Sequence, residues 1–77
     1  MKIEILGTGC PKCVELAKNA EAAVRELGAE AEIVKVTDIV EIANRGVILP
    51  PALSIDGKIV VSEKVPTVSE LKSLFRP

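Results

Sequence analysis

Apolar positions along the chain predict alternating strands and helices. The run from Ile3 to Leu6 stops at Gly7-Thr8-Gly9, which is typical of a buried strand that ends in a tight loop. After Pro11, apolar residues recur at helical spacing as far as Gly28, a residue type that commonly ends a helix. The apolar positions of this stretch are Cys13, Ala17, Ala20, Val24 and Leu27. We therefore expect a strand, a loop and then the longest helix of the chain.

The middle of the chain is predicted to hold a second strand and a short helix. Residues 31–36 are β-branched in their second half and carry two charges, which is typical of a protected strand at a sheet edge. Thr37 or Asp38 can cap a helix that ends at residue 44 or 45, and Gly46 then closes it. We expect the inward-facing residues of this helix to be Ile39, Ile42 and Ala43.

The last third of the chain is predicted to form a hairpin and a final helix. Asp56-Gly57 separates residues 52–55 from residues 58–61, and this dipeptide suits a two-residue turn because both positions need positive φ. Thr67 to Glu70 is a capping box, and Pro77 is expected to end the helix that follows. Its apolar face is expected to comprise Leu71, Leu74 and Phe75.

This order of elements predicts an α/β fold. A right-handed crossover makes the first two strands parallel, and the hairpin then extends the same sheet. The result is a four-stranded mixed sheet flanked by three helices. A chain of 77 residues is long enough for one small core, so we expect a single domain over residues 1–77.

Composition narrows the possible partners and location. Ten basic residues stand against eleven acidic ones, and no basic run is present, so we expect no nucleic-acid partner. The N-terminal apolar stretch is too short and too charged for a signal peptide, and no later run reaches membrane-spanning length. We expect a monomeric cytoplasmic protein without a membrane partner.

The two cysteines, Cys10 and Cys13, are the chemically distinctive residues. Pro11 is favoured at the first helical position, which makes Cys10 the N-cap and Cys13 the third residue of the helix. These are the positions whose side chains approach each other in a capping box. Two sulfurs placed there are expected to come within disulfide distance.

The expected reactivity of the two thiols differs. A Cys10 thiolate would be stabilised by the free N–H groups of the helix terminus and by the nearby charge of Lys12, which should lower its pKa. Cys13 lies one turn deeper on the apolar face and suits the role of a resolving thiol. The chain has no histidine, which excludes the Cys-His arrangement of cysteine hydrolases. We predict that Cys10 attacks and Cys13 resolves.

Other interpretations of the cysteine pair remain open at this point. Two thiolates three residues apart can hold a linear soft ion such as Cu(I), so a metal carrier without turnover is the main alternative. The pair could also be two small buried hydrophobic residues, or the switch of a redox sensor that catalyses nothing.

Five segments carry a resemblance to a known superfamily. They are Gly9-Cys10-Pro11-Lys12-Cys13, Gly46-Val47, Pro51-Ala52-Leu53, the hairpin Ile55-Asp56-Gly57-Lys58, and Val65-Pro66-Thr67. With these, the chain resembles the thioredoxin and glutaredoxin superfamily, and most closely its small redox-active disulfide proteins. The resemblance implies a minimal thioredoxin-like fold and a dithiol-disulfide oxidoreductase that needs no cofactor beyond a reversible Cys10-Cys13 disulfide. It also implies disulfide-containing protein substrates and a thioredoxin-reductase-like electron donor.

The resemblance further assigns roles around the cysteines. Gly9, Pro11 and Lys12 would support the active site, and Pro51 would be the family's cis-proline, which packs beside the cysteines and keeps metals away. Pro50 and Pro51 would contact the substrate, although Pro50 has no N–H for a docking hydrogen bond. Lys12 replaces the tyrosine of the usual glutaredoxin motif. No glutathione-binding turn is recognised near residues 62–67, so the resemblance does not decide glutathione dependence.

Overall fold

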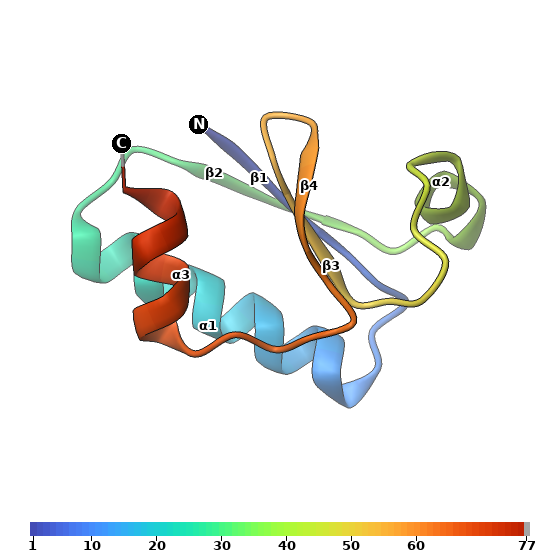
Figure 1. Cartoon of the computed structure of the whole chain (residues 1–77), viewed down its shortest axis with the longest axis horizontal. Coiled ribbons are helices and arrows are strands. Elements are labelled where there is room, and N and C mark those ends of the chain that lie inside the picture. The colour runs from blue at the N-terminus through green and yellow to red at the C-terminus, as the bar shows by residue number, and fades with distance from the viewer. Residues whose placement is uncertain (77) are drawn as a thin grey trace.

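The computed structural model describes residues 1–76 and contains one mixed sheet with three helices (Figure 1). The elements, in chain order, are β1 (Lys2–Leu6), α1 (Pro11–Leu27), β2 (Glu32–Val36), α2 (Ile39–Asn44), β3 (Ala52–Ile55), β4 (Lys58–Ser62) and α3 (Val68–Phe75). The strand order is β2-β1-β3-β4, with β1 and β2 parallel and the other two neighbouring pairs antiparallel. The α/β fold with four strands and three helices is confirmed.

Local chemistry determines where the elements begin and end. Cys10 caps α1, and Gly28 closes it in the left-handed conformation at φ 63°. Asp56 and Gly57 both take positive φ in the β3–β4 turn, as a two-residue hairpin requires. The capping box of α3 is present in both directions between Thr67 and Glu70. The expected stop at Pro77 lies outside the described residues.

One face of the sheet is covered by α1 and α3, which lie along it in Figure 1. The side chains of Ile3, Ile5 and Leu53 point from the strands into this layer and are at most 3% exposed. The residues of α1 that face them are Cys13, Leu16, Ala17, Ala20 and Ala23. Val24 and Leu27, which belong to the same set of apolar positions, are only partly buried at its margin. This layer holds the larger of the two apolar clusters.

The opposite face carries a smaller apolar cluster beneath α2. It consists of Leu6, Ile42, Val47 and Ala52. The prediction that Ile39 and Ala43 face inward is wrong, because Ile39 is 71% exposed and Ala43 is also exposed. A helix of six residues presents too few turns to bury more than one side chain against the sheet, and only Ile42 is buried. Leu74 of α3 was also expected inside but is 42% exposed.

An ion pair between the buried Glu4 and the partly exposed side chain of Arg45 connects α2 to the sheet. Glu4 in β1 is 5% exposed and points to the α2 side of the sheet, opposite to Ile3 and Ile5. Arg45, which follows α2, donates to its two carboxylate oxygens at 2.7 and 3.0 Å, and the Ser54 hydroxyl donates to Glu4 at 3.1 Å. These bonds, above all those from Arg45, lower the pKa of Glu4 against the opposing effect of burial. The Glu4-Arg45 clamp fixes the end of α2 just before the segment that leads to Pro51.

No helix within residues 1–76 combines the length and the apolar character needed to cross a membrane.

We expect Arg45→Met to lower the thermal unfolding midpoint at pH 7 by about 5 °C or more, because it leaves the Glu4 carboxylate buried without its partner. Since the pKa of Glu4 is lowered in the folded chain, the clamp stabilises the fold above the unfolded pKa of about 4.3 and this contribution is lost as pH falls through the folded pKa. The decrease in the unfolding midpoint caused by Arg45→Met should therefore be smaller at acidic pH. Calorimetry from pH 7 to pH 3 measures it.

Glu41→Gln is the matched control for the clamp. It removes only the exposed pair between Glu41 and Arg45, whose Nε–Oε1 distance is 3.0 Å, and should shift the midpoint by less than about 2 °C. Equal losses in the two variants would contradict the assignment of the stability to Glu4.

Candidate active site

The loop from Gly7 to Gly9 delivers Cys10 to the N-terminus of α1. Gly9 takes φ 94°, which favours glycine, and Cys10 then adopts an extended conformation at φ −65° and ψ 164°. Its Sγ accepts a hydrogen bond from the backbone N–H of Cys13 at 3.3 Å. Cys10 is partly exposed, whereas Cys13 is 4% exposed, and both are free thiols. The predicted N-cap position of Cys10 and the burial of Cys13 are confirmed.

The environment of Cys10 favours its thiolate. Its pKa is lowered mainly by the hydrogen bond from the Cys13 thiol, then by the backbone N–H of Cys13 and, more weakly, by that of Lys12. Burial acts in the opposite direction. The contribution from Lys12 comes from its backbone N–H, and the expected contribution of its ammonium group stays a prediction. The N-terminus of α1 therefore acts on Cys10 through individual hydrogen bonds from backbone N–H groups to its sulfur.

Cys13 is kept in its protonated form by the same contacts. Burial is the main cause that raises its pKa, followed by its hydrogen bond to Cys10 and by the negative charge of the Cys10 thiolate. The opposite shifts favour ionisation of Cys10 over ionisation of Cys13, and this difference suits the first step of thiol-disulfide exchange.

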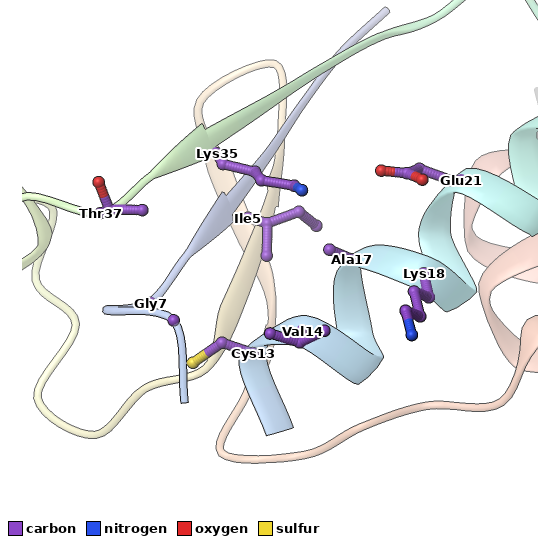
Figure 2. A pocket seen from close by; sticks show the side chains of 10 residues that line it. Ile5, Gly7, Cys13, Val14, Ala17, Lys18, Glu21, Lys35 and Thr37 are labelled. Atoms are coloured by element: carbon purple, nitrogen blue, oxygen red, sulfur yellow. The ribbon is translucent and has the colours of Figure 1, made fainter. Parts of the chain in front are cut away.

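Gly7 is a close neighbour of Cys13 that the sequence analysis did not single out. A Cβ on Gly7 would collide with the Cys13 Sγ and would lie 3.0 Å from its Cβ. Figure 2 shows Gly7 beside the Cys13 sulfur, where the chain leaves β1. The only signal in the sequence is a glycine directly after a buried strand and three residues before a cysteine.

The segment that follows α2 approaches the same place. The Pro50-Pro51 peptide bond is cis, in agreement with the family resemblance, and Pro51 is buried. Pro50 is exposed, and its Cβ lies 3.9 Å from the position of a Cβ on Gly7. The backbone N–H of Glu63 donates to the Pro51 carbonyl at 2.8 Å and ties this segment to the end of β4. The fold thus brings both Pro50 and Cys13 next to Gly7.

The remaining predicted site residues lie on the surface around the cysteines. Pro11 and Lys12 are exposed in the first turn of α1, and Gly9 is exposed in the loop. In the part of the chain that the structure describes, no group of three or more His, Cys, Asp or Glu side chains is arranged to hold a metal ion. The two thiols are the nucleophiles that this arrangement presents.

Comparison with known proteins is consistent with this geometry. A family model described as "Thioredoxin domain" matches residues 1–76. A protein named Thioredoxin from Methanocaldococcus jannaschii is 51% identical over 70 residues, which cover 91% of this chain and 80% of that protein. A protein named Thioredoxin from Methanothermobacter thermautotrophicus is 40% identical over 75 residues, which cover 97% of each chain. These similarities favour thiol-disulfide chemistry over the soft-metal carrier.

Loss of the Cys13 thiol is expected to raise the pKa of Cys10. Cys13→Ala removes the S–H donor, whereas Cys13→Ser keeps an O–H donor at the same place and should raise the pKa less. Thiolate absorbance or the rate of alkylation by iodoacetamide, followed from pH 4 to pH 10, measures the Cys10 midpoint in both variants. The same midpoint in Ala and Ser variants would show that the side chain of Cys13 does not support the thiolate.

Gly7→Ala is expected to displace the Cys13 sulfur and lower the thermal unfolding midpoint by several degrees, because the new methyl group has no free space. The control introduces Gly7→Ala into the Cys13→Ala variant, which lacks the sulfur that the new methyl group would collide with. Gly7→Ala should cost clearly less stability in that background than in the wild-type chain. If the two costs are equal, the collision with Cys13 is not the cause.

Proposed function

The chain belongs to the thioredoxin family and is a thiol-disulfide oxidoreductase, and we propose that it reduces protein disulfides with Cys10 as nucleophile and Cys13 as resolving thiol. The observation that carries the assignment of roles is the hydrogen bond from the Cys13 N–H to the Cys10 Sγ at the exposed end of α1. It supports a charged, reachable Cys10 and a protonated, buried Cys13.

The exchange takes place in two steps. The Cys10 thiolate attacks one sulfur of the substrate disulfide, a mixed disulfide forms, and the other substrate sulfur leaves as a thiolate that takes up a proton. Cys13 then loses its proton and attacks the Cys10 sulfur, so that the second substrate sulfur leaves. Two electrons pass to the substrate, and the Cys10-Cys13 disulfide remains.

Formation of the mixed disulfide itself prepares the second step. In the free protein the negative charge on Cys10 is one of the causes that raise the pKa of Cys13. That charge disappears once Cys10 is bonded to the substrate. Cys13 therefore ionises more easily in the mixed disulfide than in the free protein. Its thiolate is favoured only after the first step, when it has to attack the Cys10 sulfur.

The surface beside the cysteines supports a preference for apolar segments of protein substrates. Ile48 is 90% exposed and Leu49 is 57% exposed, and both directly precede Pro50. Val14, one residue after Cys13, is 46% exposed on the neighbouring helix. Pro50 and Pro51 would contact an extended substrate, with one docking hydrogen bond fewer because Pro50 has no N–H.

We further propose a cellular setting for this reaction. The disulfide left on the chain must be reduced again, and a thioredoxin-reductase-like electron donor would supply the electrons. No further cofactor is required for this cycle, since both electrons reside on the two sulfurs. We place the reaction in the cytoplasm and assign it to a monomer that acts as a single domain over residues 1–77.

Insulin reduction in the presence of dithiothreitol tests the proposed roles. The wild-type protein should accelerate precipitation of the insulin B chain, and Cys10→Ser should reduce the acceleration at least a hundredfold because the attacking sulfur is gone. Cys13→Ser should instead accumulate a mixed disulfide between Cys10 and the substrate, visible by non-reducing electrophoresis and mass spectrometry. If Cys10→Ser kept its activity, or formed a mixed disulfide with the substrate through Cys13, the roles assigned to the two cysteines would be reversed.

A further inference from the structure

A small pocket lies between α1 and the strands β1 and β2, next to the buried cysteine. Its volume is about 210 Å³. Figure 2 shows Ile5 on the strand side and Ala17 on the helix side of the pocket, with Cys13 at one end. These three side chains are each at most 5% exposed, and they form an apolar wall. An engineered apolar cavity of about 150 Å³ in another protein binds benzene, so the pocket has room for a group the size of a phenyl ring.

The charged groups at the other end of the pocket leave no net charge there. Figure 2 shows the Lys35 ammonium group and the Glu21 carboxylate turned toward each other, whereas the Lys18 side chain points away from the pocket. One cation and one anion that face each other give a ligand of either charge no advantage. A charged group would also lose its hydration against Ile5 and Ala17, which offer no polar partner. The pocket therefore favours an uncharged apolar group.

The pocket lies beside the place where a substrate becomes bonded to the protein. Gly9, which directly precedes Cys10, lines the pocket together with Cys13 and has no side chain that could close it off. Val14 also lines the pocket, is 46% exposed and belongs to neither apolar cluster. A substrate residue within two positions of the cysteine bonded to Cys10 stays within about 7 Å of it along an extended chain, so its side chain can reach the pocket.

Affinity decides between a free molecule and a side chain of the substrate as the occupant. A group the size of a phenyl ring makes few contacts, and we expect a dissociation constant on the order of 1 mM for it as a free molecule. A side chain of a substrate that is already bonded to Cys10 has an effective concentration on the order of 1 mM, because the short linker keeps it nearby. The pocket is therefore filled by the tethered substrate and not by a dilute free molecule.

We propose that the pocket is a specificity subsite, which receives a large uncharged side chain, such as that of phenylalanine, within two residues of the substrate cysteine bonded to Cys10. This side chain packs against Ile5 and Ala17, stabilises the mixed disulfide and accelerates the reduction of substrates that carry it. The inference rests on the proposed function, because the subsite is occupied while the substrate is bonded to Cys10. The exchange of sulfur bonds stays the one described above, and the subsite changes only which substrate is preferred.

NMR of a stable mixed disulfide tests the position of this side chain directly. The Cys13→Ser variant is bonded through Cys10 to the peptide acetyl-glycyl-cysteinyl-phenylalanine amide, and the same peptide with alanine in place of phenylalanine is the matched control. Nuclear Overhauser contacts should join the phenyl protons to the methyl groups of Ile5 and Ala17. Contacts of the ring with the segment before Pro50 instead, or with no methyl group of the protein, would overturn the subsite.

Reduction of symmetric peptide disulfides measures the effect on substrate choice. The disulfide of the phenylalanine peptide should oxidise the reduced protein about tenfold faster than that of the alanine peptide. Ala17→Leu fills the pocket and should bring this ratio close to one, whereas Val60→Phe, an enlargement on β4 outside the pocket, should preserve it. The same ratio in the wild-type protein and in Ala17→Leu would overturn the subsite.

A peptide series with the wild-type protein keeps the test independent of the folding of Ala17→Leu. At constant ionic strength, a 4-carboxyphenyl or a 4-(aminomethyl)phenyl group in place of the phenyl ring should each lower the rate about threefold or more, because both charges are disfavoured. A charged peptide that reacts as fast as the neutral one would contradict the subsite. Failure of insulin reduction together with the expected ring contacts in the chemically prepared mixed disulfide would count against the proposed function alone. Intact insulin reduction without those contacts would count against the subsite alone.

Discussion

The hydrogen bond from the Cys13 N–H to the Cys10 sulfur is the interaction on which the chemistry of this chain depends. It requires a cysteine at the N-cap, a helix that begins at the next residue and a loop that turns the chain into that helix. Pro11 satisfies the second condition and Gly9, at φ 94°, the third. This one hydrogen bond pairs a backbone N–H that the first turn of the helix would otherwise leave free. It also stabilises the thiolate form of Cys10.

The rest of the fold holds other groups against this helix terminus. Burial of Ile3, Ile5 and Leu53 beneath α1 fixes the height of the helix above the sheet. Gly7 then passes so close to Cys13 that no side chain fits between them. The segment ending at Pro51 also lies next to Gly7 and is tied to the end of β4 by the Glu63 N–H. Rigid secondary structure thus places a small set of loop residues around two sulfurs.

The features that the sequence predicted well are those whose cause lies within a few residues. The N-cap at Cys10, the Asp56-Gly57 turn and the capping box of Thr67 and Glu70 depend only on near neighbours, and all three are present. The inward positions of Ile39 and Leu74 were wrong because burial depends on how a helix lies against the sheet, which periodicity alone does not determine.

The local sequence did not identify the partners in contacts between distant residues. Glu4 and Arg45 are 41 positions apart, and nothing near either residue identifies the other as its partner. A charge amid the apolar residues of β1 was the one hint that Glu4 needed a partner. The pocket beside Cys13 likewise depends on the register of β1 and β2 and on the packing of α1.

The placement of the Glu4-Arg45 clamp has a consequence for how this protein can change over evolution. The clamp lies on the α2 side of the sheet, whereas Cys13 belongs to the helix on the other side. Groups separated by a layer of strands and sharing no partner contribute to free energy almost additively. Substitutions on the α2 side can therefore change thermal stability without changing electron transfer at the cysteines on the α1 side. The two properties are then open to separate selection.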